Sequence, residues 1–188
     1  MQSCSTSTSW SHAIGEASVS TARVIAVAGL GAPAPSLVTA AFDPPILLQI
    51  FVLVTGLSVS SIPRLRFNGD TGTTNYAYNV TDNNLILSVV TLAGLTGVAG
   101  AADGILLARA NSTGPIGSSL LIGNGPSQGH MIMFSGTAGL MDASAAPALI
   151  SGSGLWANTA RITSIQLDSP AGGNLSAGTG ILVVSYEI

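Results

Sequence analysis

Charged side chains are scarce in this sequence of 188 residues, where Asp, Glu, Lys and Arg together make up only 7%. Ordinary soluble domains carry about 25%. Lysine is absent, and the five basic residues, all Arg, stand against eight acidic ones, which gives a formal net charge of -3. Five scattered arginines cannot form the basic stripe that neutralises phosphates, so the composition excludes a nucleic-acid-binding function.

A surface with so few charges must be built from Ser, Thr, Asn, Gln and backbone groups. A protein that stays monomeric in solution normally carries many charges of both signs. Burying a neutral polar surface against a partner costs less free energy than burying a charged one, because no ion has to leave water. We therefore expect this chain to pack against copies of itself or against other subunits. The alternative is a monomer with a neutral surface rich in Ser and Thr.

Cysteine is almost absent as well, since Cys4 is the only one. This excludes an intrachain disulfide and a zinc site with several thiolates, and it favours synthesis in a reducing cytoplasm. The N-terminus has no positively charged region followed by an apolar stretch, so we expect no secretory signal. The apolar run from Ile46 to Leu57 is shorter than the roughly 20 residues of a membrane span and is interrupted by Gln49 and Thr55. This run predicts a buried strand.

Patterns typical of catalysis are weak. Residues 125–129 match the G-x-S-x-G pattern of a nucleophile elbow. That elbow needs a strand-to-helix turn and an acid and a histidine that follow the serine in the chain. His12 precedes Ser127, and His130 follows it after three residues with no acid between them. No Lys is available for a phosphate loop, and the acids form no evident pair. We expect no enzymatic activity, no cofactor and no metal.

Short apolar runs rich in Val, Ile and Leu alternate with clusters of Gly, Pro, Asn and Ser, and no stretch is typical of an amphipathic helix. Glycine contributes 23 residues. Such spacing is typical of an all-β sandwich or barrel. We predict one jelly-roll-like β-sandwich over residues 21–188, preceded by an N-terminal arm over residues 1–20. The expected strands cover residues 22–28, 46–55, 64–67, 75–80, 85–92, 105–110, 119–122, 130–134, 161–167 and 180–188.

Three residues are candidates for an interface. The arm over residues 1–20 is rich in Ser and Thr, which is typical of a segment ordered by contact with a neighbour. Trp10 within it is a plausible anchor, because Trp is enriched among interface hot spots. An edge strand that folds Trp10 back onto its own domain is the alternative. Arg64 and Arg66 share one face of a strand and are expected to be ion-pair donors at an interface. Trp156 is a further candidate, although a position in the core is favoured.

Residues 68–72, Asn-Gly-Asp-Thr-Gly, predict a tight turn, because Asn, Gly and Asp adopt positive φ or bond their own backbone. Asn68, Asp70, Thr73 and Asn75 also offer oxygen atoms, so a calcium site is an alternative. One carboxylate makes a weak site, and we favour the turn. The turn Asp82-Asn83-Asn84 is expected to separate two strands.

Two segments carry a resemblance to a known group of proteins. Residues 65–72, Leu-Arg-Phe-Asn-Gly-Asp-Thr-Gly, followed by Asn-Tyr-Ala-Tyr over 75–78, resemble small tailed-phage structural proteins in which an RFNGD-x-G turn precedes NY and an aromatic residue. Residues 162–165 and 173–179 resemble the closing hairpin of the same proteins. The likeness covers residues 46–188, whereas the preceding segment and the low charge depart from it.

The resemblance implies a jelly-roll decoration (cement) protein of a phage capsid. It would be a virion protein assembled in the host cytoplasm, a homotrimer that docks on the major capsid protein and has no membrane partner. One alternative is a receptor- or carbohydrate-binding module of a fibre or spike, for which the aromatic candidates are Trp10, Tyr76, Tyr78 and Trp156. Another is a tail-spike glycan hydrolase, for which an acid pair is missing.

We expect deletion of residues 1–20 to abolish docking and leave the fold intact, because the arm lies outside the predicted sandwich. Cosedimentation with phage heads measures docking, and far-UV circular dichroism measures the fold. A deleted chain that still binds the heads would contradict the role of the arm.

Overall fold

The computed structural model describes the backbone of residues 21–86, 89–95, 103–107, 113–125, 129–141 and 146–186. Side chains are described over 21–78, 103–107, 113–125, 129–133 and 151–186. The arm predicted over residues 1–20, with Trp10, lies outside the described residues, as does Ser127. No helix that could span a membrane occurs in the described part of the chain.

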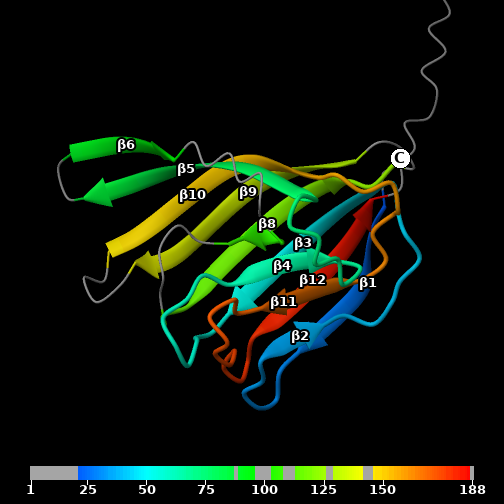
Figure 1. Ribbon diagram of the computed structural model, residues 1–188, viewed down its shortest axis with the longest axis horizontal. Helices are drawn as coiled ribbons and strands as arrows, with labels where there is room; N and C mark the ends of the chain where they lie inside the picture. The colour runs from blue at the N-terminus through cyan, green and yellow to red at the C-terminus, as the bar shows by residue number, and fades with distance from the viewer. Residues whose placement is uncertain are drawn as a thin grey trace, which may run out of the picture.

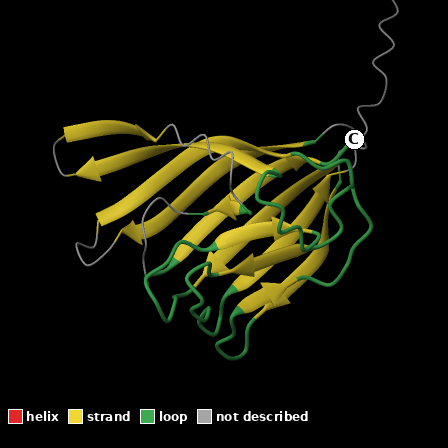
Figure 2. Ribbon diagram, in the orientation of Figure 1, coloured by secondary structure: helices red, strands yellow, loops and turns green. Residues whose placement is uncertain are grey.

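The fold is all-β, as the sequence predicts, and consists of two antiparallel sheets (Figures 1 and 2). The strands are β1 (Ala22–Gly29), β2 (Ser36–Val38), β3 (Leu47–Val54), β4 (Arg64–Phe67), β5 (Tyr76–Ile86), β6 (Val89–Leu95), β7 (Ile105–Leu106), β8 (Ile116–Gly123), β9 (His130–Met141), β10 (Ala146–Trp156), β11 (Ile165–Asp168) and β12 (Gly180–Tyr186).

The large sheet has eight strands in the order β1-β12-β3-β8-β9-β10-β5-β6, and the small sheet has four in the order β2-β11-β4-β7. The small sheet lies over the part of the large sheet that contains β1, β12 and β3, while β5 and β6 extend beyond it (Figure 1). The early strands pair with late ones in a nested order: β1 with β12, β2 with β11, β3 with β8 and β4 with β7. These pairs alternate between the two sheets.

The core lies between the sheets and follows from the alternation of side chains along each strand. In β3, every second residue from Leu48 to Val54 is buried, and its neighbours point outward. Leu65 and Phe67 of β4, with Ile165 and Leu167 of β11, bury the facing side of the small sheet. Burial of apolar surface stabilises the fold by about 25 cal/mol per Å².

Several sequence predictions are wrong in detail. Residues 82–84 form no turn, because β5 continues through them to Ile86 and pairs with β10 from Tyr76 to Asn84. The strand expected over 161–167 begins only at Ile165. The expected closing hairpin is not formed: β11 pairs with β2 and β4 in the small sheet, while β12 pairs with β1 and β3 in the large one. The strands β2 and β10 were not expected.

The late start of β11 has a local cause in Asn68. Its side-chain oxygen accepts hydrogen bonds from the backbone N–H groups of Thr163 (2.8 Å) and Ser164 (3.1 Å), and its amide donates to the carbonyl of Arg161 (2.8 Å). These backbone groups therefore bond a turn side chain rather than a neighbouring strand. Asn68 and Gly69 both adopt positive φ, 53° and 66°, which confirms the predicted tight turn.

The carboxylate of Asp70 joins this turn to the aromatic part of the core. It accepts hydrogen bonds from the indole N–H of Trp156 (2.8 Å), the backbone N–H of Gly72 (2.8 Å) and the amides of Asn75 (2.9 Å) and Asn158 (3.3 Å). Burial raises the pKa of Asp70, but these hydrogen bonds outweigh that effect and hold the pKa below its ordinary value.

The aromatic cluster that Asp70 supports consists of Phe67, Tyr76, Trp156 and His130. Trp156 stacks on His130 with ring centroids 5.1 Å apart and contacts Phe67 at 5.5 Å. The Tyr76 hydroxyl donates to the backbone carbonyl of Asp70 (3.2 Å) and accepts from the N–H of Phe67 (3.0 Å). Burial raises the pKa of Tyr76 to about 12. Trp156 is a core residue, in agreement with the favoured interpretation of the sequence.

We expect Asp70→Asn to lower the free energy of unfolding by about 1–3 kcal/mol near neutral pH, because the buried indole N–H loses its charged acceptor. Since the folded-state pKa of Asp70 is lowered, its contribution is complete above the unfolded pKa and is lost as the pH falls through the folded pKa. The difference between variant and wild type should therefore shrink in acid. Urea unfolding followed by Trp fluorescence measures it.

Asp43→Asn is the matched control for Asp70→Asn, since Asp43 is an exposed carboxylate with no hydrogen bond to a described residue. We expect that variant to unfold like the wild type. An Asp70→Asn deficit that is the same in acid as near neutral pH would show that its carboxylate charge is irrelevant.

Candidate functional site

Arg64 and Arg66 lie on the outward face of β4, as the alternation in the sequence predicts, and both belong to a four-membered ion cluster. Arg64 Nε contacts Asp168 Oδ1 at 2.9 Å, and its Nη1 contacts Asp103. Arg66 contacts Asp168 Oδ2 and Asp103 Oδ2, each at 2.6 Å. Arg66 Nε also donates to the backbone carbonyl of Asp103 (2.8 Å).

The cluster is electrically neutral, and three of its four side chains are largely buried. The exposed fractions of the two arginine side chains are 11% and 12% and that of Asp168 is 10%, whereas Asp103 is 35% exposed. Asp168 is the direct cross-strand partner of Arg64, which explains the short contacts. Burial raises the pKa of Asp103, but both guanidinium groups outweigh it and hold the pKa below its ordinary value.

Gly104 allows the Asp103 segment to lie flat on this cluster. A Cβ at position 104 would stand 2.5 Å from Arg64 Cγ and 2.7 Å from the carbonyl oxygen of Leu65, which is closer than atoms pack. The arginines are thus ion-pair donors within the chain, and their role at an interface between subunits stays a prediction.

The outward face of the large sheet carries a continuous neutral surface, called here the outer face. Its described side chains are all uncharged, because the charged residues of these strands point elsewhere or lie outside the described range. They belong to six neighbouring strands and comprise Ala22, Val24, Val27, Leu182, Val184, Tyr186, Leu47, Gln49, Phe51, Leu53, Ser119, Leu121, Met131, Met133, Ser151, Ser153 and Leu155.

Seven of the ten exposed large apolar residues in the described part of the chain lie on the outer face. They are Val24, Val27, Phe51, Leu53, Met131, Met133 and Leu155. The register places Val24 beside Val184 and Val27 beside Leu182, so β1 continues the apolar surface of β12. Contiguous exposed apolar patches of several hundred Å² on a soluble protein mark sites of interaction.

The main polar groups of the outer face bond one another. The Tyr186 hydroxyl donates to Gln49 Oε1 (2.6 Å), and the Gln49 amide donates to the hydroxyl of Ser119 (2.9 Å). This chain of bonds crosses β12, β3 and β8. A partner can therefore cover these groups without leaving them unsatisfied, which removes the main cost of burying polar atoms.

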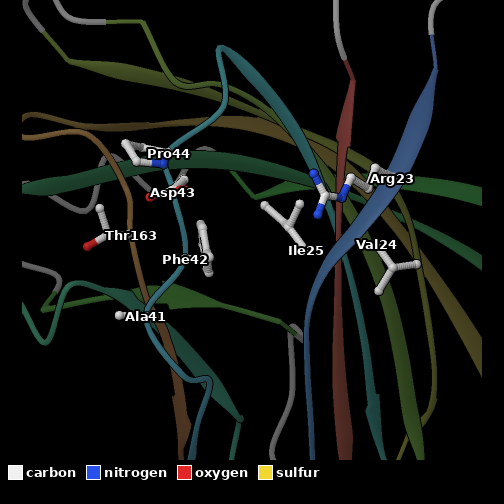
Figure 3. A pocket seen from close by; sticks show the side chains of 8 residues that line it. All are labelled: Arg23, Val24, Ile25, Ala41, Phe42, Asp43, Pro44 and Thr163. Atoms are coloured by element: carbon white, nitrogen blue, oxygen red, sulfur yellow. The ribbon is translucent and has the colours of Figure 1, made fainter.

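A groove opens on the other side of β1, between this strand and residues 41–46. One cavity of about 650 Å³ is lined by Arg23, Val24, Ile25, Ala41, Phe42, Asp43, Pro44 and Thr163 (Figure 3). A second of about 350 Å³ shares four of these residues and reaches Ser185 and Tyr186. Arg23 projects from β1 toward the hollow, and Asp43 lies on the segment across from it (Figure 3).

The catalytic and metal-binding alternatives find little support in the geometry. His130 is buried, and its ring nitrogens face the carbonyl oxygens of Gly123 (3.3 Å) and Ala160 (2.8 Å) rather than a nucleophile. The oxygen atoms of Asn68 and Asp70 that were candidates for calcium accept hydrogen bonds from N–H groups. Within the described residues, no group of three or more His, Cys, Asp or Glu converges on one point.

The sequence alone did not reveal the outer face or the groove. Each is made by strands that are distant in the chain and neighbouring in the sheet. The one signal available was the scarcity of charge. In comparisons with known proteins, no family model, curated protein or solved structure matches the chain.

We expect Asp168→Asn to lower the free energy of unfolding by about 2–4 kcal/mol, because two nearly buried guanidinium groups are then left with one carboxylate. Combining it with Arg64→Met should cost clearly less than the sum of the single variants, since the partners are lost together. Urea denaturation of all four proteins measures the cycle. Strict additivity would contradict direct coupling between the two residues.

Proposed function

We propose that this chain is a non-enzymatic structural protein of a tailed-phage virion, a decoration protein that stabilises the head by self-association and docking on the major capsid protein. The observation that carries the proposal is the neutral, largely apolar outer face, on which the principal polar side chains already bond one another. A surface with these properties gains free energy when it is covered and repels no copy of itself through charge.

The size of the outer face fits this role. With strands about 4.8 Å apart and about 3.4 Å per residue along each strand, the described part spans on the order of 600 Å² in projection. A standard protein interface buries about 800 Å² of accessible surface per partner, which exceeds the projected area because side chains roughen the surface. The outer face is therefore large enough to hold subunits together.

The jelly-roll fold is part of this proposal, and the nested strand pairing supports it. The chain runs as one long antiparallel ribbon, in which β1 to β4 pair in turn with β12, β11, β8 and β7, and the ribbon is rolled so that its pairs alternate between two sheets. Eight strands in two sheets is the jelly-roll arrangement of many capsid domains. The hairpins β5–β6 and β9–β10 then extend one sheet.

Two parts of this proposal, the position in a virion and the homotrimer, rest on the resemblance to tailed-phage proteins. The two segments that carry it have structural roles here: Asp70 of the first accepts a hydrogen bond from the core Trp156, and Thr163 and Ser164, beside the second, donate to Asn68. For the carbohydrate-binding alternative, two of the four aromatic candidates, Tyr76 and Trp156, are buried. They therefore offer no platform for a sugar ring.

We expect the purified chain to have three times its 18.7 kDa mass in solution. Leu53→Asp should weaken this association at least about tenfold, because a carboxylate placed in an apolar interface must lose its water. Val38→Asp is the matched control, since Val38 is 54% exposed and Leu53 51% exposed but Val38 lies on β2 of the small sheet. Light scattering coupled to size exclusion measures the mass over a range of concentrations.

A Leu53→Asp chain that keeps the wild-type mass would rule out the outer face as the contact. A wild-type chain that is monomeric at every concentration and does not cosediment with phage heads would overturn the proposed function as a whole.

A further inference from the structure

Two charged side chains stand out because they have no partner among the described residues. Arg64, Arg66, Asp103 and Asp168 form the ion cluster, Asp70 accepts several hydrogen bonds, and Arg161 donates to the carbonyl of Asn124. Arg23 and Asp43 are the remaining charged residues whose side chains are described, and neither side chain takes part in an ion pair or hydrogen bond with a described residue. Both line the same groove. In a chain with so little charge, this placement indicates a ligand that supplies the missing partners.

The groove runs beside an open sheet edge. Among the described strands, β1 is the terminal strand of the large sheet and pairs only with β12, so the backbone groups of its other edge have no strand partner there. Its sequence, Ala-Arg-Val-Ile-Ala-Val-Ala-Gly, contains no Lys and no Pro to discourage pairing. A register irregularity between Val24 and Ala26 and the charge of Arg23 are the protections visible in this strand. An extended peptide added to such an edge gains main-chain hydrogen bonds, and the neighbouring pockets select its side chains.

Resting on the proposed self-association, we propose that this groove accepts residues 1–20 of another copy of the chain as an added strand along β1. The segment ends two residues before β1 begins at Ala22, so every assembled subunit carries one segment and one groove. In extended form, 20 residues reach up to about 66 Å, which is enough to cross to a neighbour.

The segment has the chemistry that the groove lacks. Glu16 is its one acidic side chain and complements Arg23, and His12 offers a donor to Asp43. The apolar ring of Trp10 can pack against Phe42 in the wall of the groove. This contact would give Trp10 the interface role that the sequence predicts for it.

The geometry of a tight hairpin favours docking between copies over docking within one chain. To bring Glu16 opposite Arg23 in the same chain, the two central residues of the turn would be Val19 and Ser20. Two-residue hairpin turns require positive φ at one or both of these positions and favour Gly, Asn or Asp. Val is β-branched and opposes that conformation. A segment that arrives from a neighbour needs no such turn.

The test uses full-length chains that carry Cys4→Ser and Ser11→Cys, labelled at the new cysteine with a benzophenone photo-crosslinker. Equal amounts of ¹⁴N and ¹⁵N protein are mixed, left to exchange and irradiated, and the cross-linked peptides are identified by mass spectrometry. We expect cross-links to residues 22–29 and 41–46 that join a ¹⁴N peptide to a ¹⁵N peptide. Arg23→Glu should lower their yield at least about fivefold, and adding Glu16→Arg to the same chain should restore it.

The outcomes separate this inference from the proposed function. A trimer whose cross-links to the groove all carry a single isotope, or lie elsewhere, would overturn docking between copies and leave self-association through the outer face intact. Loss of yield in Arg23→Glu without rescue by Glu16→Arg would overturn the assigned pairing. Mixed-isotope cross-links in a protein whose mass is unchanged by Leu53→Asp would support the groove and contradict the outer face.

Discussion

Removing a charge from water is costly unless an opposite charge or several hydrogen bonds replace the water, and this constraint organises the molecule. Four of the few charges close on one another in the cluster of Arg64, Arg66, Asp103 and Asp168. The carboxylate of Asp70 accepts hydrogen bonds that hold the aromatic core. The large sheet is thereby left with an outward face that carries no described charge, and two charges remain at the groove.

The strand order decides where these surfaces lie. The nested pairing brings the first and last strands together, so β1 becomes an edge of the large sheet, with β12 and then β3 beside it. The small sheet covers only one face of the large sheet, and its own outward face carries the ion cluster. Apolar residues that alternate in β3 and β12 therefore serve two purposes: one set fills the core, and the other, including Phe51 and Leu53, forms the outer face.

The sequence predicted the strands whose signal is local. The alternation in β3, β4 and β12 and the Asn-Gly turn at residues 68–69 are determined by neighbouring residues, and they appear where expected. Strands that depend on distant partners were missed or misplaced. β10 contains Gly152 and Gly154, which weaken its strand propensity, yet a side chain at 154 would press against Ala77 and Tyr78 of β5. β5 runs through three polar residues that are typical of turns because β10 pairs with all of them. Arg64 and Arg66 were predicted to share a face, but their acidic partners come from residues 103 and 168, which no local pattern connects.

The two proposed surfaces differ in what they require of symmetry, and together they favour a closed ring. A flat face shared by two copies alone would produce a two-fold dimer. The outer face spans six strands, so in a trimer with the large sheets turned toward a three-fold axis, one side of each face meets one neighbour and the other side meets the second. The proposed exchange of an N-terminal segment would be head-to-tail, because each subunit would give its segment to one neighbour and receive one from the other. Head-to-tail contacts close into rings when the rotation between neighbours allows it. In such a ring, apolar faces would supply most of the free energy of association, and exchanged segments would fix the order of the subunits. Neither contact requires many surface charges, which is consistent with the composition of this chain.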